Sequence, residues 1–329
     1  MAGTAPDVLS GEQLTVIQVR LEAAGVHSLV LGRPDGKPLP SWEPGAHIHL
    51  SLPSGVTRQY SLCGDPADTS TYTVAVLREV NGRGGSAEIH DTALVGRALK
   101  VHGPRNQFPL EDAERFLFIA GGIGITPILA MVRTALASGR EWTLIYGGRT
   151  RASMAFVDEL QGLAAGRVRI LPEDRLGILP LREVISDVEP GTAIYACGPE
   201  GMLRAVSDVC EAKGLASRLH LERFSAGPEP VTGGSVASAA RMPFEVELRR
   251  TGVTVLVPPE RGLLEVVKDV VADVQFSCEE GYCGFCESRV LEGVPEHHDQ
   301  ILSEEEKENG DTMIICVGRS KSNRLVLDL

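Results

Sequence analysis

The sequence predicts three folded regions in series: an antiparallel β-barrel, an α/β domain with an open parallel sheet, and a small α+β domain. Residues 13–108 carry short runs of alternating apolar positions separated by turn residues, which is typical of an antiparallel barrel. From residue 116 onward, continuous apolar runs alternate with helical patterns. A small-residue, Pro/Gly/Ser-rich stretch then has the composition of a flexible linker. We place the domains at residues 10–109, 110–226 and 243–329, with the linker at 227–242.

Composition and charge narrow the classes of partner. The chain has 329 residues, enough for about two or three domains. It has no apolar run of about 18 residues, and its start lacks a basic segment followed by an apolar core, so we expect no membrane association and a cytoplasmic location. A net charge of −12 argues against nucleic acid. The same charge suits a basic protein partner, although solubility alone explains it equally well. We expect a monomer.

The barrel begins with two strands within residues 13–34, joined by a turn. The segments 45–55 and 71–80 continue the alternation. Residues 58–61 are expected to lie between two of these strands.

The α/β region begins with the apolar run Phe116–Ala120, which indicates a buried parallel strand. A glycine-rich turn, 121–127, follows, and then a helix that ends at Gly139. A strand, glycine turn and helix in this order present helix amides to a pyrophosphate. Pro127 replaces the third glycine of the usual dinucleotide motif and suits the first turn of a helix.

Two further strands, at 143–150 and 192–199, extend this sheet. Right-handed crossovers place the ends of all its strands on one edge, where ligands bind. The loops expected at that edge are Gly122–Thr126, Gly147–Arg149 and Cys197–Pro199.

The third region contains Cys278, Cys283 and Cys286 in a C-x4-C-x2-C spacing, and Cys316 follows near the C-terminus. This is the plant-type ligand pattern of a [2Fe–2S] cluster. A structural zinc site is the alternative, but zinc usually takes its thiolates as two short pairs. A disulfide framework is disfavoured because seven is an odd number of cysteines. Gly281 and Gly284 allow the backbone to turn closely around the cluster.

The remainder of this region predicts a hairpin at 244–259 and an amphipathic helix at 262–274. Ser303 and Glu306 have capping-box spacing. Cys316 is expected in the last strand pair, formed by 312–318 and 324–329.

Two barrel motifs, R-Q-Y-S at 58–61 and N-G-R-G-G-S at 81–86, resemble those of the ferredoxin–NADP reductase superfamily of flavoproteins. The resemblance implies that the first motif lies along a flavin and that the second holds the phosphate of FMN. Glycine-loop amides, a serine hydroxyl and an arginine suit an anion, and a tyrosine offers an apolar face to a ring. Only the family preference favours FMN over FAD. The implied flavin-binding residues are Arg58, Gln59, Tyr60, Ser61, Val76, Leu77, Arg78, Gly84, Gly85 and Ser86.

The same resemblance places Cys197 beside a nicotinamide and Thr126 where flavin and nucleotide meet, as the two catalytic candidates. Without it, Cys197 reads as a small buried hydrophobe. The other implied cofactor-binding residues are Gly122, Gly124, Arg149, Gly198, Pro199, Phe224 and Ser225.

Charged residues in the α/β region give conflicting predictions for the nucleotide, NADPH or NADH. Arg149 and Arg151 favour a 2′-phosphate, whereas Glu173 and Asp174 favour a free 2′-hydroxyl. The family favours NADH. A solvated strand-end arginine is the alternative for Arg149.

Barrel, nucleotide domain, linker and a β-grasp ferredoxin, in that order, resemble the phthalate dioxygenase reductase family, which includes the vanillate demethylase reductases. This implies an NADH-dependent reductase component that takes a hydride onto FMN and passes single electrons through the cluster to a terminal Rieske non-haem iron oxygenase. The alternatives are a small-molecule or cytochrome P450 acceptor, or a zinc-stabilised, nucleotide-sensing interaction protein. We expect no general acid or base, and interpret His90, His102, His297 and His298 as packing or surface residues. The cluster-loop residues Glu279, Glu280 and Tyr282 form the predicted docking face, unless they are only a solvated surface.

Overall fold

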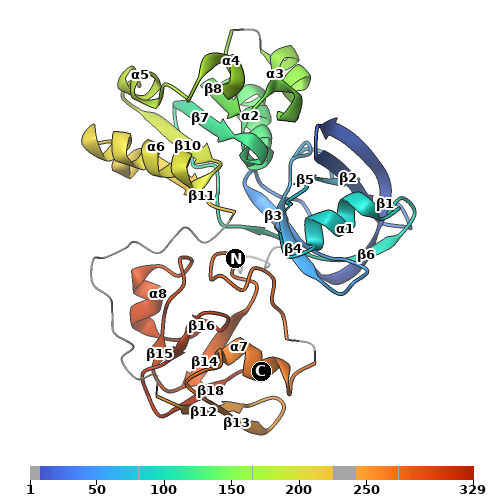
Figure 1. Cartoon of the computed structure of the whole chain (residues 1–329), viewed down its shortest axis with the longest axis vertical. Helices are drawn as coiled ribbons and strands as arrows, with labels where there is room; N and C mark the ends of the chain where they lie inside the picture. Colours follow the sequence, from blue (N-terminus) through green and yellow to red (C-terminus); the bar gives the residue numbers. More distant parts are fainter. Residues whose placement is uncertain (1–7, 81, 165, 225–241, 273) are drawn as a thin grey trace, which may run out of the picture. The chain divides into compact units, whose positions relative to one another are not determined.

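The computed structural model describes residues 8–80, 82–164, 166–224, 242–272 and 274–329. The chain divides into two compact units, Met1–Phe224 and Ser225–Leu329. In Figure 1 the first unit runs from blue to yellow and the second from orange to red. Among the described residues, no helix combines the length and the apolar character needed to cross a bilayer.

The barrel of the first unit is a six-stranded sheet in the order β4-β3-β6-β1-β2-β5, with antiparallel pairing throughout (Figure 1). An isolated antiparallel bridge between Leu62 and Val74 joins the two outer strands and closes it. Alternate residues of β3, such as Ile48 and Leu50, are fully buried in its core. The elements are β1 (Leu9–Ala23), β2 (Val26–Gly32), β3 (Ala46–Ser51), β4 (Thr57–Ser61), β5 (Tyr72–Leu77), α1 (Gly85–Asp91) and β6 (Ala98–Asn106).

The predicted pair of strands within 13–34 is confirmed as β1 and β2, although β1 begins earlier, at Leu9. The placement of residues 58–61 between strands is wrong. They form a strand of their own, β4, which pairs residue by residue with β3.

The second sheet of this unit is parallel, with five strands in the order β11-β10-β7-β8-β9. Helices α2 and α3 pack on one face and α5 and α6 on the other. The sequence predicted β7, β8 and β10 but not the outer strands β9 and β11. The elements are β7 (Arg115–Gly121), α2 (Ile125–Ala137), β8 (Glu141–Gly148), α3 (Val157–Leu163), β9 (Val168–Pro172), α4 (Glu173–Leu176), α5 (Leu181–Ser186), β10 (Thr192–Cys197), α6 (Glu200–Ala212) and β11 (Leu219–Glu222), with 3₁₀ turns at Gly122–Gly124, Arg151–Ser153 and Ala216–Arg218.

The second unit holds a five-stranded sheet in the order β13-β12-β18-β14-β16, with helix α7 packed in its core. The predicted hairpin is confirmed, with Phe244 of β12 opposite Val257 of β13. The capping box of Ser303 and Glu306 is confirmed at the start of α8. The elements are β12 (Phe244–Leu248), β13 (Val253–Val257), α7 (Leu263–Lys268), β14 (Glu287–Glu292), β15 (Pro295–Glu296), α8 (Glu304–Asn309), β16 (Thr312–Ile314), β17 (Arg319–Ser320) and β18 (Arg324–Leu327).

Two expectations for this unit are wrong. Helix α7 ends at Lys268 instead of extending to residue 274. Cys316 lies in a turn after β16, and β16 pairs with β14 rather than with β18. The final strand instead runs parallel to β12 in the middle of the sheet.

Candidate functional site

The two flavin-type motifs of the barrel meet in space. Arg58 of β4 lies over the glycine loop, and a Cβ added at Gly85 would lie 2.8 Å from its Cγ. The Arg58 guanidinium also donates to the carbonyl oxygen of Arg83 at 3.1 Å, across 25 residues of sequence. Gly84 has φ 86°, in the left-handed region that favours glycine. These glycines therefore permit a close approach between an arginine and a loop of backbone amides.

Helix α1 begins in this loop and is fixed at its first turn. The backbone N–H of Glu79 donates to Ser86 Oγ at 3.0 Å. Glu88 accepts from the backbone N–H and the hydroxyl of Ser54, at 2.9 and 2.5 Å. Helix N-terminal amides, a serine hydroxyl and an arginine thus lie close together, which is the donor set that a phosphate prefers.

The other flavin candidates line β4 and β5. Tyr60 is half-buried against the barrel core, and burial raises the pKa of its phenol, which therefore stays neutral. Val76 is buried in the core, and its carbonyl oxygen lies 2.9 Å from His90 Nε2. Arg78 is exposed and forms an ion pair with Asp91. The remaining candidates are Gln59 and Leu77, which are half-buried, and Ser61, which is buried.

Three predicted loops meet at the carboxyl edge of the parallel sheet, and two of them are in direct contact. A Cβ at Gly124 would lie 2.3 Å from the carbonyl oxygen of Cys197. Similarly, a Cβ at Gly121 would lie 2.7 Å from Cδ of Pro199. Glycine in the first loop therefore lets the backbone of the second pass directly beside it.

Thr126 lies in the first turn of α2 and is only 2% exposed. Its hydroxyl donates to the carbonyl oxygen of Ile123 at 3.0 Å, so its proton is engaged within the turn and its oxygen can still accept. Tyr146 of β8 donates to the carbonyl oxygen of Gly122 at 3.2 Å, which ties the glycine turn to the neighbouring strand.

Cys197 ends β10, and Glu222 lies opposite it at the end of β11. The thiol is fully buried, and burial raises its pKa well above the usual value, with a further contribution from Glu222. Burial also raises the pKa of the Glu222 carboxyl, to about 8. One of its oxygens, Oε2, is buried without a hydrogen-bond partner among the described residues. At neutral pH this carboxyl therefore holds a proton that it can donate.

Sequence reasoning missed Glu222. The signal was its position in the segment L-H-L-E-R-F-S at 219–225, of which only Phe224 and Ser225 were predicted to contact the flavin. Phe224 follows β11 and is 37% exposed. Ser225 lies outside the described residues. The neighbouring Arg223 forms an ion pair with Glu200 at 3.3 Å.

Three of the charged residues that bear on the choice between NADH and NADPH lie next to one another. Arg149 has an exposed side chain, and its carbonyl oxygen accepts from the backbone N–H of Asp174 at 3.0 Å. Glu173 and Asp174 begin α4 and are both exposed. Arg151 is also exposed and forms an ion pair with Asp158 at 3.0 Å. This region therefore presents both positive and negative side chains.

In the second unit, the four predicted cysteine ligands converge. Cys278, Cys283 and Cys286 are buried, and Cys316 is half-buried. Hydrogen bonds from the thiols of Cys283 and Cys316 lower the pKa of Cys278 to about 2. The same bonds raise the pKa of both donors. These mutual interactions place the sulfurs of Cys278, Cys283 and Cys316 next to one another, as ligation of a single cluster requires.

The loop backbone fits an inorganic core. Gly281 and Gly284 have φ 75° and 68°, in the left-handed region. The backbone N–H of Glu280 donates to Cys278 Sγ at 3.3 Å. Hydrogen bonds to sulfur of this type help to set the reduction potential of iron–sulfur clusters. Ile315 N–H donates to the carbonyl oxygen of Cys286 at 3.3 Å and so brings the turn with Cys316 to the loop.

No three His, Cys, Asp or Glu side chains in the described parts of the chain are grouped so that they could hold one metal ion. A [2Fe–2S] cluster instead divides four thiolates between two irons. Of the predicted docking residues, Glu279 is exposed and lies 3.5 Å from Lys268 Nζ, whereas Glu280 and Tyr282 are half-buried.

Known protein families match parts of both units of the chain. Residues 246–321 match the 2Fe-2S iron-sulfur cluster binding domain. Residues 105–218 match the N-terminal domain of dimethylamine monooxygenase subunit DmmA-like proteins. The carnitine monooxygenase reductase subunit of Escherichia coli is 39% identical, with 96% of this chain and 98% of that protein covered. The vanillate O-demethylase oxidoreductase of a Pseudomonas species is 38% identical, with 96% and 99% covered. The phthalate dioxygenase reductase of Burkholderia cepacia is 36% identical, with 93% and 94% covered.

Solved structures give the same result. A phthalate dioxygenase reductase, described as a modular structure for electron transfer from pyridine nucleotides to [2Fe-2S], matches with a TM-score of 0.71 and 36% identity, over 97% of this chain and 98% of that one. An intact type IV self-sufficient cytochrome P450 monooxygenase matches with a TM-score of 0.83 and 39% identity, over 97% of this chain but only 41% of that one. The chain therefore belongs to the phthalate dioxygenase reductase family, whose members are oxidoreductases that carry electrons from a pyridine nucleotide through a flavin to a [2Fe–2S] cluster.

Proposed function

We propose that this protein is the NADH-dependent reductase component of a multicomponent oxygenase or demethylase. The observation that carries the proposal is the presence of four converging cysteines and two glycine-loop sites in a chain that relatives match over nearly its full length. A nicotinamide gives up two electrons together, whereas a [2Fe–2S] cluster takes one at a time, and a bound flavin supplies the conversion between them. We assign the steps to domains at 10–109, 110–226 and 243–329.

The flavin is FMN in this proposal. The contact between Arg58 and Gly85, with Ser86 at the start of α1, supports a binding site for the terminal phosphate of FMN at this loop. Arg58 supplies charge, the loop amides supply donors, and Tyr60 supplies an apolar ring that stays uncharged. The proposed flavin contacts also include Gln59, Ser61, Val76, Leu77, Arg78, Gly84 and Phe224 from the described residues, together with Ser225.

The nucleotide lies at the carboxyl edge of the parallel sheet in this proposal. Gly122 and Gly124 leave room for a pyrophosphate at the start of α2, and Arg149 contributes a positive charge. Thr126 and Cys197 orient the reacting rings as buried, neutral groups. Glu222 joins them as a donor to the carboxamide of the nicotinamide, because its proton is retained at neutral pH. Gly198 and Pro199 complete the loop. The exposed carboxylates of Glu173 and Asp174 support NADH over NADPH.

Cys278, Cys283, Cys286 and Cys316 are the proposed cluster ligands, and the cluster is the exit for electrons. Glu279, Glu280 and Tyr282 are the proposed docking face for the acceptor. Because several relatives are named as reductase subunits of oxygenases, we infer that a terminal Rieske-type oxygenase is the acceptor. Thiolate ligands and free cysteines are consistent with a reducing compartment such as the cytoplasm.

A cytochrome P450 is the second candidate acceptor. The observation that favours it is the likeness of this whole chain to part of a self-sufficient P450 monooxygenase. Mixing the reductase with each class of acceptor under NADH, and measuring product per NADH, separates the two.

Cofactor content and acceptor choice test the proposal together. The purified chain should be red-brown and contain about one FMN, two irons and two sulfides. NADH should reduce cytochrome c, a one-electron protein acceptor, rapidly. A colourless, zinc-loaded protein would contradict the proposal. Fast NADH oxidation that needs no protein acceptor would instead indicate a small-molecule reductase.

A further inference from the structure

Arg133 joins the barrel to the nucleotide-binding sheet through a three-way contact within the first unit. It lies on α2, and its Nη1 donates to the carbonyl oxygens of Cys63 at 2.5 Å and Gly64 at 2.6 Å. Its Nη2 donates to the carboxylate of Glu159 on α3. The Arg133 side chain is only 22% exposed, so these bonds are largely shielded from water. Charge-assisted bonds of this kind are stronger and more directional than neutral ones.

The two ends of this contact continue into the two proposed cofactor sites. Cys63 follows Ser61, the last residue of β4, by two positions, and β4 carries Arg58 and Tyr60. Arg133 lies about two turns along α2 from Thr126, which corresponds to about 10 Å. A shift of the guanidinium relative to the carbonyls would therefore displace one cofactor support relative to the other.

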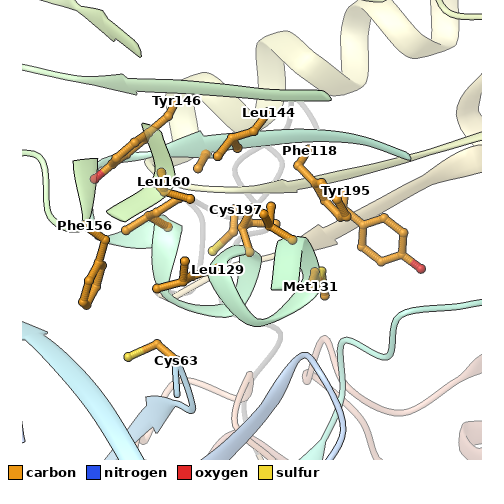
Figure 2. Packing of buried hydrophobic residues seen from close by; sticks show 14 of the residues in the cluster. Cys63, Phe118, Leu129, Met131, Leu144, Tyr146, Phe156, Leu160, Tyr195 and Cys197 are labelled. Atoms are coloured by element: carbon orange, nitrogen blue, oxygen red, sulfur yellow. The ribbon is translucent and has the colours of Figure 1, made fainter. Parts of the chain in front are cut away.

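The apolar contacts between the barrel and α2 do not fix how the two are aligned with each other. Cys63 packs in the hydrophobic cluster of the parallel sheet, and Ala130 of α2 packs in the cluster of the barrel. In Figure 2, Cys63 lies on a barrel segment across from the helix that carries Leu129 and Met131. Apolar burial is non-directional, so it tolerates small sliding movements. A charged guanidinium whose Nη1 donates to two successive carbonyl oxygens, with Nη2 held by Glu159, tolerates much less.

The barrel side of the contact is itself held rigidly. Cys63 N–H donates to the carbonyl oxygen of Thr73 on β5 at 2.9 Å, and its thiol donates to the same oxygen at 3.5 Å. A second link across the boundary, from Ala24 N–H to the carbonyl oxygen of Ala152 at 2.8 Å, lies on other segments. The segment held by Arg133 is thus the one that leads directly out of the proposed flavin strand.

From these contacts we propose that Arg133 is a positioning residue for hydride transfer: it sets the distance between the nicotinamide held by the α2 edge and the flavin held by β4. This rests on the proposed function. The α2 edge would hold the nicotinamide and β4 the flavin, which would accept the hydride, one proton with two electrons, that the nicotinamide gives up. Arg133 would act on both through the Cys63–Gly64 backbone, to which it donates directly.

The test compares Arg133→Met, Arg133→Lys and Glu159→Gln with a control, Arg140→Met, in the flavin- and cluster-loaded protein. Arg140 also forms an ion pair, at 2.7 Å, but its partner Asp112 lies just before β7 and outside the barrel strands. Anaerobic stopped-flow absorbance gives the rate constant of flavin reduction at saturating NADH and the Kd of NADH. The long-wavelength absorbance of the nicotinamide–flavin pair reports their stacking. Amide exchange of residues 62–65 in the flavin-free protein reports the contact between Arg133 and the barrel without turnover.

Arg133→Met should slow flavin reduction by about tenfold, given that a 1 Å displacement costs about 100-fold in comparable systems. The Kd of NADH and the flavin content should stay near the parent values. The long-wavelength absorbance should weaken, and amide exchange at residues 62–65 should rise. Arg133→Lys should recover the rate to within about threefold, because an ammonium can still donate to the two carbonyls. Glu159→Gln and Arg140→Met should lie near the parent.

An unchanged rate of flavin reduction in Arg133→Met with normal flavin content would overturn the inference. An equal loss in Arg140→Met would do so as well, because it would show a general effect of stability. A parent protein that binds no flavin, or whose flavin NADH does not reduce, would overturn the proposed function itself.

Discussion

Replacing Glu222 by Gln removes a carboxyl whose pKa is raised by burial from 4.5 to about 8. The folded state binds this proton more tightly than the unfolded state, so the group's contribution to stability is complete below pH 4.5 and is lost as the pH rises to about 8. At about 1.4 kcal/mol per pH unit the full difference approaches 5 kcal/mol. The side chain is partly exposed, and solvent screening reduces the expected loss to about 2–4 kcal/mol. A glutamine does not titrate, so the Glu222→Gln variant should not show this loss of stability with rising pH.

Guanidinium unfolding at pH 5, 6.5 and 8.5 measures this prediction. Tryptophan fluorescence is a suitable probe because both tryptophans, Trp42 and Trp142, lie in the first unit together with Glu222. At pH 8.5 the Glu222→Gln variant should be more stable than the parent, and at pH 5 the two should be close. Glu211→Gln, which alters an exposed carboxylate on α6, should keep the pH dependence of the parent. If parent and Glu222→Gln lose stability equally between pH 5 and 8.5, the carboxyl is not buried and neutral as described.

Three other changes test the separate sites. Cys316→Ser should remove the iron–sulfur absorbance and abolish cytochrome c reduction while NADH still reduces the flavin, and retained transfer to cytochrome c would refute the ligand assignment. Gly124→Ala places a Cβ 2.3 Å from the carbonyl oxygen of Cys197, so the unfolding free energy should fall by about 1–3 kcal/mol and NADH should bind more weakly by titration. Arg58→Gln should weaken FMN binding to the apoprotein by about 10–100-fold, as expected for the loss of a charged hydrogen bond. Riboflavin, which lacks the phosphate, serves as its control: an equal loss for riboflavin would show that Arg58 does not contact the phosphate.

The cluster cysteines could be predicted from the sequence because iron ligation fixes both residue type and spacing. Their local structure was harder to predict. The apolar, β-branched run around Cys316 favours a strand, but a hydrogen bond from Gly318 N–H to the carbonyl oxygen of Ile314, at 2.9 Å, closes a turn there instead. The apolar positions after Lys268 continued the helical period, yet the β-branched Val270 and Val271 favour helix weakly, and α7 ends before them.

Long-range pairing explains what sequence reasoning missed at the nucleotide edge. The segment 219–222 alternates apolar and polar residues and so predicts an exposed carboxylate at its end. The Oε2 atom of Glu222 is buried because β11 lies along β10 with this carboxylate opposite Cys197. Likewise, the contact of Arg58 with Gly85 depends on β4 and the start of α1 meeting across the barrel, which no local pattern encodes.

The pairing of β1 with β6 has a consequence for synthesis of the chain. Leu9 lies opposite Gly103, so the first strand has no partner on that side until about a hundred residues have been made. Ribosomes add about 5–20 residues per second, so this edge of β1 stays open for several seconds in the nascent chain. Exposed strand edges are where chains pair wrongly with one another. We therefore expect truncations within β6 to aggregate, whereas a fragment ending after Asn106 contains every strand needed to close the barrel.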